Sequence, residues 1–192
     1  MPVVVRAFVA VPCGERLAGA LTTVLDGWRA GPAGTLPVRW TRPDNWHLTL
    51  QFLGDWPESR LAELQKALRA SATPQHFTLV PGELGGFPNL SAPRVLFLQL
   101  GGGGRAEQLA KTVRDCTAEC WPDGPQDTRA FRAHLTLGRV KVRLSFGERN
   151  IVRDLKLGPL PEISVEGYSL VGSELRPDGP RYTELGFFAL RK

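Results

Sequence analysis

The tetrapeptide His-Leu-Thr-Leu occurs twice in the chain, beginning at His47 and again at His134. The two copies lie 87 residues apart, close to half of the 192-residue length. Under ordinary residue usage a given four-residue match has a probability on the order of 10⁻⁵, so the recurrence indicates two related halves. A chain built from two such halves is expected to fold into two similar lobes related by a pseudo-twofold axis.

Each tetrapeptide has the pattern of a strand in which polar and apolar side chains alternate. His47 and Thr49 point to one face of such a strand and Leu48 and Leu50 to the other, and the second copy repeats this arrangement. If the leucines pack into the core, each strand presents an imidazole and a hydroxyl on its opposite face. Lobes related by a pseudo-twofold axis bring these two faces together across a shared cleft.

The remaining sequence predicts strands alternating with helices. Apolar runs that alternate or are β-branched predict strands at Val3–Val11, Val38–Trp40, His47–Leu53, Phe77–Val80, Val95–Leu100, Ala133–Val140, Ile163–Val171 and Tyr182–Leu190. Helical periodicity predicts helices at Glu15–Trp28, Pro57–Ala70, Arg105–Cys120 and Phe146–Leu155. Gly- and Pro-rich segments predict loops at 31–34, 85–88, 101–104 and 123–125, and a hairpin turn at 177–180. We read the Gly101–Gly104 run as a flexible linker, because it lacks the Lys-Ser/Thr ending of a P-loop.

The chain carries a formal charge of +5, and 19 of its 24 basic residues are Arg. A guanidinium binds phosphate oxygens through a planar fork, so an anionic partner is expected, although a composition bias toward Arg explains the charge nearly as well. No apolar run reaches the roughly 18 residues of a membrane span, and the first residues lack a basic segment followed by a long apolar core. We therefore expect a cytoplasmic protein with no membrane partner.

The cysteine and histidine spacings do not indicate a metal site. Cys116 and Cys120 have helical spacing without neighbouring histidines, so all three cysteines are expected to be reduced thiols. A metal held by His47 and His134 would need further ligands, and no carboxylate-rich or Cys-rich partner occurs at a recognisable spacing. His76 has no motif around it and is expected to be an ordinary polar residue.

Two imidazoles and two hydroxyls in one cleft suit the cleavage of a phosphodiester. A neutral histidine takes a proton from the nucleophile, a protonated histidine gives one to the leaving oxygen, and the two threonines donate to the non-bridging oxygens. Arg132 precedes His134 by two residues and is expected on the same face, where it would bind the phosphate. The residues alone leave open which histidine is the acid.

The motifs 47–54 (His-Leu-Thr-Leu-Gln-Phe-Leu-Gly) and 131–139 (Phe-Arg-Ala-His-Leu-Thr-Leu-Gly-Arg) resemble those of the two-histidine phosphoesterase superfamily. Within it the chain is similar to the RNA 2′,3′-cyclic phosphodiesterases, also called 2′-5′ RNA ligases. The resemblance implies an α+β bilobal fold, with two pseudo-twofold-related lobes that each have an antiparallel sheet and outer helices. It places the active site in the central cleft. Residues 1–192 are then a single domain of two duplicated lobes with interleaved strands.

The resemblance also implies an activity and a set of site residues. The expected reaction opens an RNA-terminal 2′,3′-cyclic phosphate to a 2′-phosphate without cofactor or metal. His47 is then the proton donor and His134 the proton acceptor, and the phosphate ligands are Thr49, Thr136 and Arg132. The candidates for base stacking are Trp46, Phe52 and Phe131, of which at least two are expected to pack in the core instead. The expected partners are RNA ends, such as tRNA fragments, bound by a monomer.

Three alternatives to RNA-end hydrolysis remain open. The first is the joining of RNA ends through a 2′-5′ bond without ATP, which is the same chemistry in reverse. The second is the opening of the cyclic phosphate of a small nucleotide. The third is a non-catalytic module that binds RNA ends, for which binding should be tight, salt-dependent and free of product.

Overall fold

The computed structural model of the protein describes residues 3–124, 130–177 and 179–192. The strands in chain order are β1 (Val4–Pro12), β2 (Val38–Trp40), β3 (His47–Pro57), β4 (Phe77–Phe87), β5 (Val95–Gly101), β6 (His134–Val140), β7 (Ile163–Val165), β8 (Gly167–Arg176) and β9 (Gly179–Ala189). The α-helices are α1 (Glu15–Ala30), α2 (Leu61–Ala70), α3 (Arg105–Cys120) and α4 (Phe146–Asp154). Short 3-10 turns occur at Pro32–Thr35, Pro43–Asn45 and Glu58–Arg60. No helix in the described ranges is long and apolar enough to cross a membrane.

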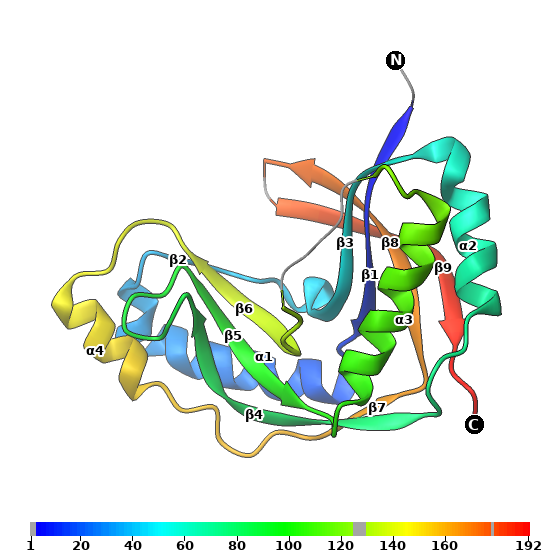
Figure 1. Ribbon diagram of the computed structural model, residues 1–192. Helices are drawn as coiled ribbons and strands as arrows, with labels where there is room; N and C mark the ends of the chain where they lie inside the picture. Colours follow the sequence, from blue (N-terminus) through cyan, green and yellow to red (C-terminus); the bar gives the residue numbers. More distant parts are fainter. Residues whose placement is uncertain (1–2, 125–129, 178) are drawn as a thin grey trace.

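The strands form one curled antiparallel sheet in the order β7-β4-β5-β6-β3-β1-β8-β9, with β2 paired to β6 (Figure 1). Most neighbours pair over many residues, whereas the register that joins β3 to β6 consists of the single pair Leu48↔Leu135. This junction divides the sheet into a first lobe, β3-β1-β8-β9, and a second lobe, β6-β5-β4-β7 with β2. The expected α+β, bilobal architecture is confirmed.

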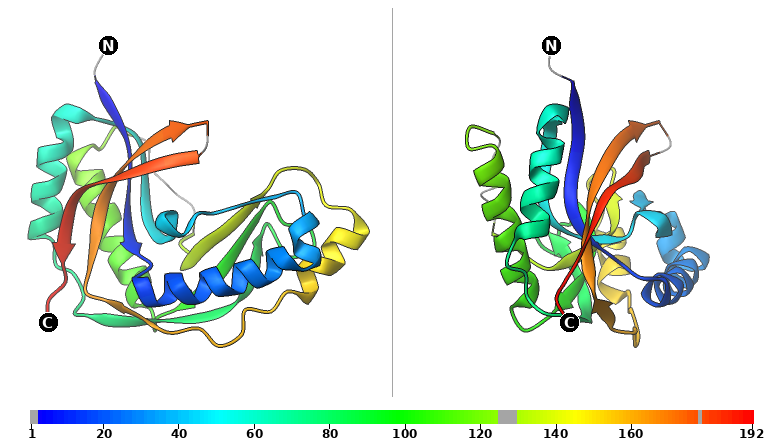
Figure 2. Two further views of the ribbon diagram at one scale, coloured as in Figure 1. Left: turned by 180° about the vertical axis from the view of Figure 1, so that it is seen from behind. Right: turned by 90° about the vertical axis from the view of Figure 1, so that its right-hand side faces the viewer.

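A helix from each half of the chain covers the lobe that carries the histidine motif of the other half. Helix α1, from the first half, lies along the sheet of the second lobe, whereas α2 and α3 cover the first lobe (Figures 1 and 2). Side-chain contacts agree with this arrangement: the Trp28 ring of α1 packs 5.8 Å from Trp40 of β2, and its Nε1 donates to the Lys156 carbonyl at 3.0 Å. Helix α3, from the second half, packs against β3.

The four leucines of the repeated tetrapeptides lie in the core, as the alternation predicts. Leu48, Leu50, Leu135 and Leu137 each expose 3% of their surface or less. Full burial of one such side chain stabilises the fold by roughly 1.5–3 kcal/mol. Because Leu48 and Leu135 are also the pair that joins the lobes, they fix the two histidine-bearing strands side by side.

Strand β4 continues through Gly85 and Gly86, where the sequence predicts a loop. A Cβ atom at Gly85 would lie 2.3 Å from the Phe97 ring on the neighbouring strand β5. The glycine therefore makes room for an aromatic ring from the adjacent strand, a common reason for glycine within a sheet.

The helix expected to begin at Pro57 begins four residues later. Pro57 ends β3, and α2 begins only at Leu61 after one 3-10 turn.

The segment expected as one strand from Ile163 to Val171 is two strands. Strand β7 pairs with β4 in the second lobe, and β8 pairs with β1 in the first lobe, so the chain crosses between lobes at Glu166. The hairpin expected at 177–180 is present as the antiparallel pair β8 and β9, whose register extends to Arg176↔Gly179. Asp178 lies outside the described residues.

Candidate active site

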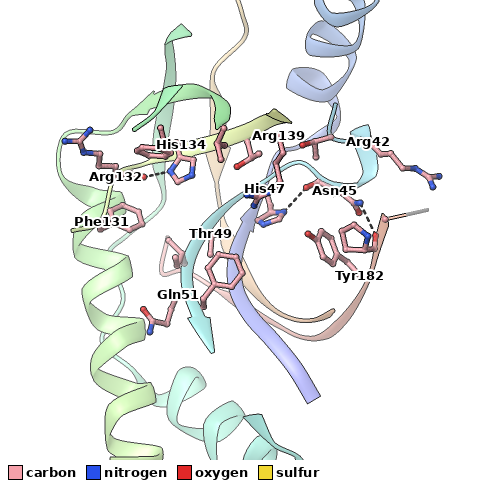
Figure 3. A pocket seen from close by; sticks show the side chains of 18 of the residues that line it. Arg42, Asn45, His47, Thr49, Gln51, Phe131, Arg132, His134, Arg139 and Tyr182 are labelled. Atoms are coloured by element: carbon pink, nitrogen blue, oxygen red, sulfur yellow. Dashed lines mark hydrogen bonds between the residues drawn. The ribbon is translucent and has the colours of Figure 1, made fainter. Parts of the chain in front are cut away.

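The two tetrapeptides face a cavity of about 550 Å³ where the lobes meet. This central cavity is large enough for a nucleotide-sized ligand. Its walls include both motif histidines and both motif threonines, as Figure 3 shows in part. Around them lie polar and aromatic residues from both lobes and from the tip of the β8–β9 hairpin: Arg39, Arg42, Asn45, Gln51, Phe52, Arg114, Phe131, Arg132, Arg139, Pro180 and Tyr182.

A β-bulge follows the threonine in each copy of the motif. In β3 the register against β1 shifts between Thr49 and Gln51, so Leu50 is an extra residue. In β6 the register against β5 shifts between Thr136 and Gly138, so Leu137 is an extra residue. Since a bulge changes the face on which the following residues point, the fifth residue after each histidine can join the cavity wall.

These fifth residues are Phe52 and Arg139, and both line the central cavity. They occupy equivalent positions in the two lobes, yet one is an aromatic ring and the other a cation. Strict alternation from His134 would turn Arg139 away from the cavity, so its place in the cavity wall does not follow from the sequence pattern. The only sequence signal was its place at the end of the second extended motif.

Both histidine rings are held by the same backbone contact. Nδ1 of His47 lies 2.8 Å from the Asn45 carbonyl oxygen, and Nδ1 of His134 lies 2.7 Å from the Arg132 carbonyl oxygen. A carbonyl only accepts, so each Nδ1 carries a proton and donates it. Each Nε2 then accepts a proton when the ring is neutral and donates one when it is charged.

Aromatic rings surround both imidazoles. His47 stacks on Phe8 with ring centroids 4.7 Å apart and meets Tyr182 edge-on at 5.4 Å. His134 meets Phe87 and Phe97 edge-on at 5.0 and 5.2 Å. These contacts hold both rings in fixed orientations, and burial keeps water away from the His47 ring.

The pKa of His47 is lowered to about 4, mainly by burial; the hydrogen bond to the Asn45 carbonyl acts in the opposite direction, and the charge of nearby His134 adds to the lowering. His47 is therefore neutral at pH 7. A bound anion would oppose this effect, because an opposite charge nearby favours the protonated ring. Burial also raises the pKa of the Tyr182 hydroxyl, and the Arg139 charge lowers it.

Arginines supply positive charge on several sides of the cavity. Arg139 extends from β6 toward His47, whereas the exposed Arg132 directs its guanidinium to the side of His134 that faces away from His47 (Figure 3). As expected, Arg132 and His134 line the same cavity. Their side chains nevertheless point in different directions (Figure 3). Across the cavity, Asn45 donates from Nδ2 to the Pro180 carbonyl at 3.1 Å and so ties the first motif to the β8–β9 hairpin.

The three candidates for base stacking differ in position. Trp46 is 4% exposed and absent from the cavity wall, because its ring packs in the core. Phe52 is 44% exposed and, like Phe131, lines the cavity. Phe131 is partly buried and also packs against the core, so the expectation that at least two of the three pack there agrees with the structure.

Other residues that the sequence singled out lie elsewhere. His76 is outside the cavity wall, and its backbone N–H donates to the Arg191 carbonyl. Cys13, Cys116 and Cys120 are free and buried. Within the described part of the chain, no cluster of three or more His, Cys, Asp or Glu side chains has the arrangement of a metal site.

The comparisons with known proteins agree with this geometry. The family model described as LigT like Phosphoesterase matches residues 20–97. The RNA 2′,3′-cyclic phosphodiesterase of Archaeoglobus fulgidus is 32% identical over 183 residues, covering 95% of this chain and 99% of that protein. The crystal structure of TT0787 of Thermus thermophilus has a TM-score of 0.77 at 29% identity, covering 97% of this chain and 98% of that one. E. coli LigT complexed with 3′-AMP has a TM-score of 0.75 at 25% identity, covering 98% and 99%.

A two-lobed α+β fold with a His-x-Thr strand in each lobe defines a phosphoesterase of the two-histidine type. Similarity to the archaeal relative extends over nearly the whole length of both proteins. The chain therefore belongs to the RNA 2′,3′-cyclic phosphodiesterase family of LigT-like phosphoesterases.

Proposed function

We propose that this protein hydrolyses 2′,3′-cyclic phosphates at RNA ends and leaves a 2′-phosphate and a 3′-hydroxyl. The observation that carries the proposal is the pair of imidazoles that line one cavity, each oriented by the same contact between its Nδ1 atom and a backbone carbonyl oxygen. Relatives named RNA 2′,3′-cyclic phosphodiesterase support the substrate class. A strained five-membered cyclic phosphate needs only a nucleophile and a proton for its leaving oxygen.

In the proposed reaction His134 takes a proton from water as the water oxygen attacks phosphorus. The bond between phosphorus and O3′ breaks, and His47 gives its proton to O3′. The roles of proton donor and proton acceptor follow the resemblance to the family. Water thereby adds a hydroxyl to phosphorus and, through the two histidines, a proton to the ribose.

The other cavity residues have supporting roles in this proposal. Thr49 and Thr136 donate hydrogen bonds to the non-bridging oxygens, and Arg132 offsets charge at the phosphate. We add Arg139 to this set, because it extends toward His47 and its charge acts on neighbouring Tyr182. A 5′-hydroxyl in place of water would run the reaction toward a 2′-5′ RNA bond without ATP.

We further propose that residues 1–192 act as one unit and as a monomer, since both lobes of a single chain contribute to the cavity wall. The expected substrates are RNA fragments in the cytoplasm, including fragments of tRNA.

The test is incubation with a short oligonucleotide that ends in a 2′,3′-cyclic phosphate, followed by identification of the product end. A 2′-phosphate supports the proposal, and an unchanged end at high protein concentration contradicts it. The division of roles is tested with an aryl phosphodiester whose leaving group needs no proton. His47→Ala should then be impaired far less than on the cyclic phosphate, whereas His134→Ala should be impaired on both substrates.

A further inference from the structure

One end of the central cavity carries polar groups that the proposed chemistry does not use. Gln51 follows the bulge in β3 and is only 3% exposed, yet it lines the cavity. Its side chain is therefore a nearly fully buried polar group at the cavity wall. In Figure 3, Gln51 and Phe131 lie on the opposite side of Thr49 from Tyr182. A buried amide next to an open cavity has donors and an acceptor available for a ligand.

Arg114 lines the same cavity from helix α3, which packs against β3. Its Nε is buried and has no hydrogen-bond partner within the described residues. The residue as a whole is half-buried and lines the cavity, so its guanidinium supplies N–H donors for a ligand that brings an acceptor there. Phe131 adds an aromatic face, since it is half-buried and also lines the cavity.

A buried amide, a buried guanidinium edge and an aromatic ring suit a planar, polar heterocycle. We propose that Gln51, Arg114 and Phe131 bind the base of the nucleotide that carries the cyclic phosphate, and that they favour guanine. This inference rests on the proposed function. Phe131 packs on the face of the base, while Gln51 and Arg114 recognise its edge.

Guanine fits this site because of its adjacent acceptors. Two neighbouring N–H groups of a guanidinium form a fork that matches O6 and N7 of guanine. Adenine presents a donor beside N7, which would face the donors of Arg114. A phosphate group fits less well, because it would pair with Arg114 alone and leave the carbonyl oxygen of Gln51 and the ring of Phe131 without a matching group.

The test compares Gln51→Met and Arg114→Met with the wild type on four nucleoside 2′,3′-cyclic phosphates. The reference substrate is methyl riboside 2,3-cyclic phosphate, which lacks a base. Arg105→Met is the matched control, because Arg105 is an exposed arginine at the start of the same helix. A good bidentate contact corresponds to roughly tenfold to hundredfold discrimination, so Arg114→Met should lower kcat/KM for the guanosine substrate by about that factor. Gln51→Met should lower it in the same direction.

The base-free substrate should be hydrolysed equally well by the wild type and all three variants, which also shows that the variants are folded. Equal losses with and without a base would overturn the proposal, since the residues would then act on ribose or phosphate. Unchanged kcat/KM on every nucleoside, or a loss seen only with longer oligonucleotides, would overturn it as well. Equilibrium binding of guanosine 2′-monophosphate gives a readout without turnover. A wild type that binds this nucleotide but hydrolyses nothing refutes the proposed function and leaves the base site supported.

Discussion

Binding of a phosphodiester anion should raise the pKa of His47 from about 4 to near neutrality. A single negative charge about 4 Å from the imidazole contributes about 4 kcal/mol at an effective dielectric constant of about 20. At about 1.4 kcal/mol per pKa unit this is roughly three units, which brings the pKa to roughly 7. His47 can then serve as the proton donor at physiological pH, although burial keeps it neutral in the free protein.

The assay is an NMR titration of the imidazole resonances with and without a 3′-deoxynucleoside 2′-methylphosphate. This ligand keeps one negative charge over the titration range and lacks the 3′-hydroxyl that would re-form the ring. His76 is the internal control, because it lies outside the cavity and its resonances should not respond to the ligand. His134→Gln should raise the pKa of His47 only slightly in the free protein, since burial is the main cause of the shift. If the pKa of His47 stays near 4 at saturating ligand, the reasoning is refuted and His47 is not the acid.

Four further outcomes are expected. His47→Ala and His134→Ala should each lower the rate on the cyclic phosphate by at least about 10²-fold without loss of the fold, measured by kinetics and circular dichroism. Arg139→Lys should be impaired more than Arg132→Lys in kcat/KM, because Arg132 directs its guanidinium away from His47 (Figure 3), and equal losses would contradict this ranking. Activity should persist in excess chelator, and loss with rescue by a divalent ion would contradict the metal-free mechanism. His47 binds fewer protons in the folded than in the unfolded state between pH 6.5 and about 4. The free energy of unfolding should therefore fall by about 3 kcal/mol more in the wild type than in His47→Gln as the pH drops through this range in urea titrations.

The sequence was sufficient for those features that depend on local periodicity. Alternation predicted that the leucines of both motifs would be buried and that each histidine would share a face with its threonine, as in Leu48 and Thr49. Helical periodicity predicted both ends of α3. These patterns need only the chain itself and a core to pack against.

Features that depend on a neighbouring strand were not visible in the sequence. Each bulge is a shift in the register between two paired strands, β3 with β1 and β6 with β5. No local sequence pattern therefore predicts that Arg139 points into the cavity. The loop expected at Gly85 was wrong for a similar reason, since the glycine accommodates Phe97 from another strand. Which of the three stacking candidates packs in the core could not be predicted, because the burial of Trp46 depends on packing that the sequence does not reveal.

The bulges also give an account of how a nearly twofold-symmetric cavity binds its substrate in one direction. The histidines, threonines and Nδ1 contacts are matched between the lobes, so they alone would accept a cyclic phosphate in either of two orientations. The fifth residue after each histidine removes this equivalence, because Arg139 attracts negative charge and Phe52 offers an apolar ring. The phosphate should therefore lie toward Arg139 and the base toward the β3 end of the cavity, where Gln51 is the immediate neighbour of Phe52. The bulges, which could not be predicted from the sequence, thus place a cation beside one copy of the motif and an aromatic ring beside the other.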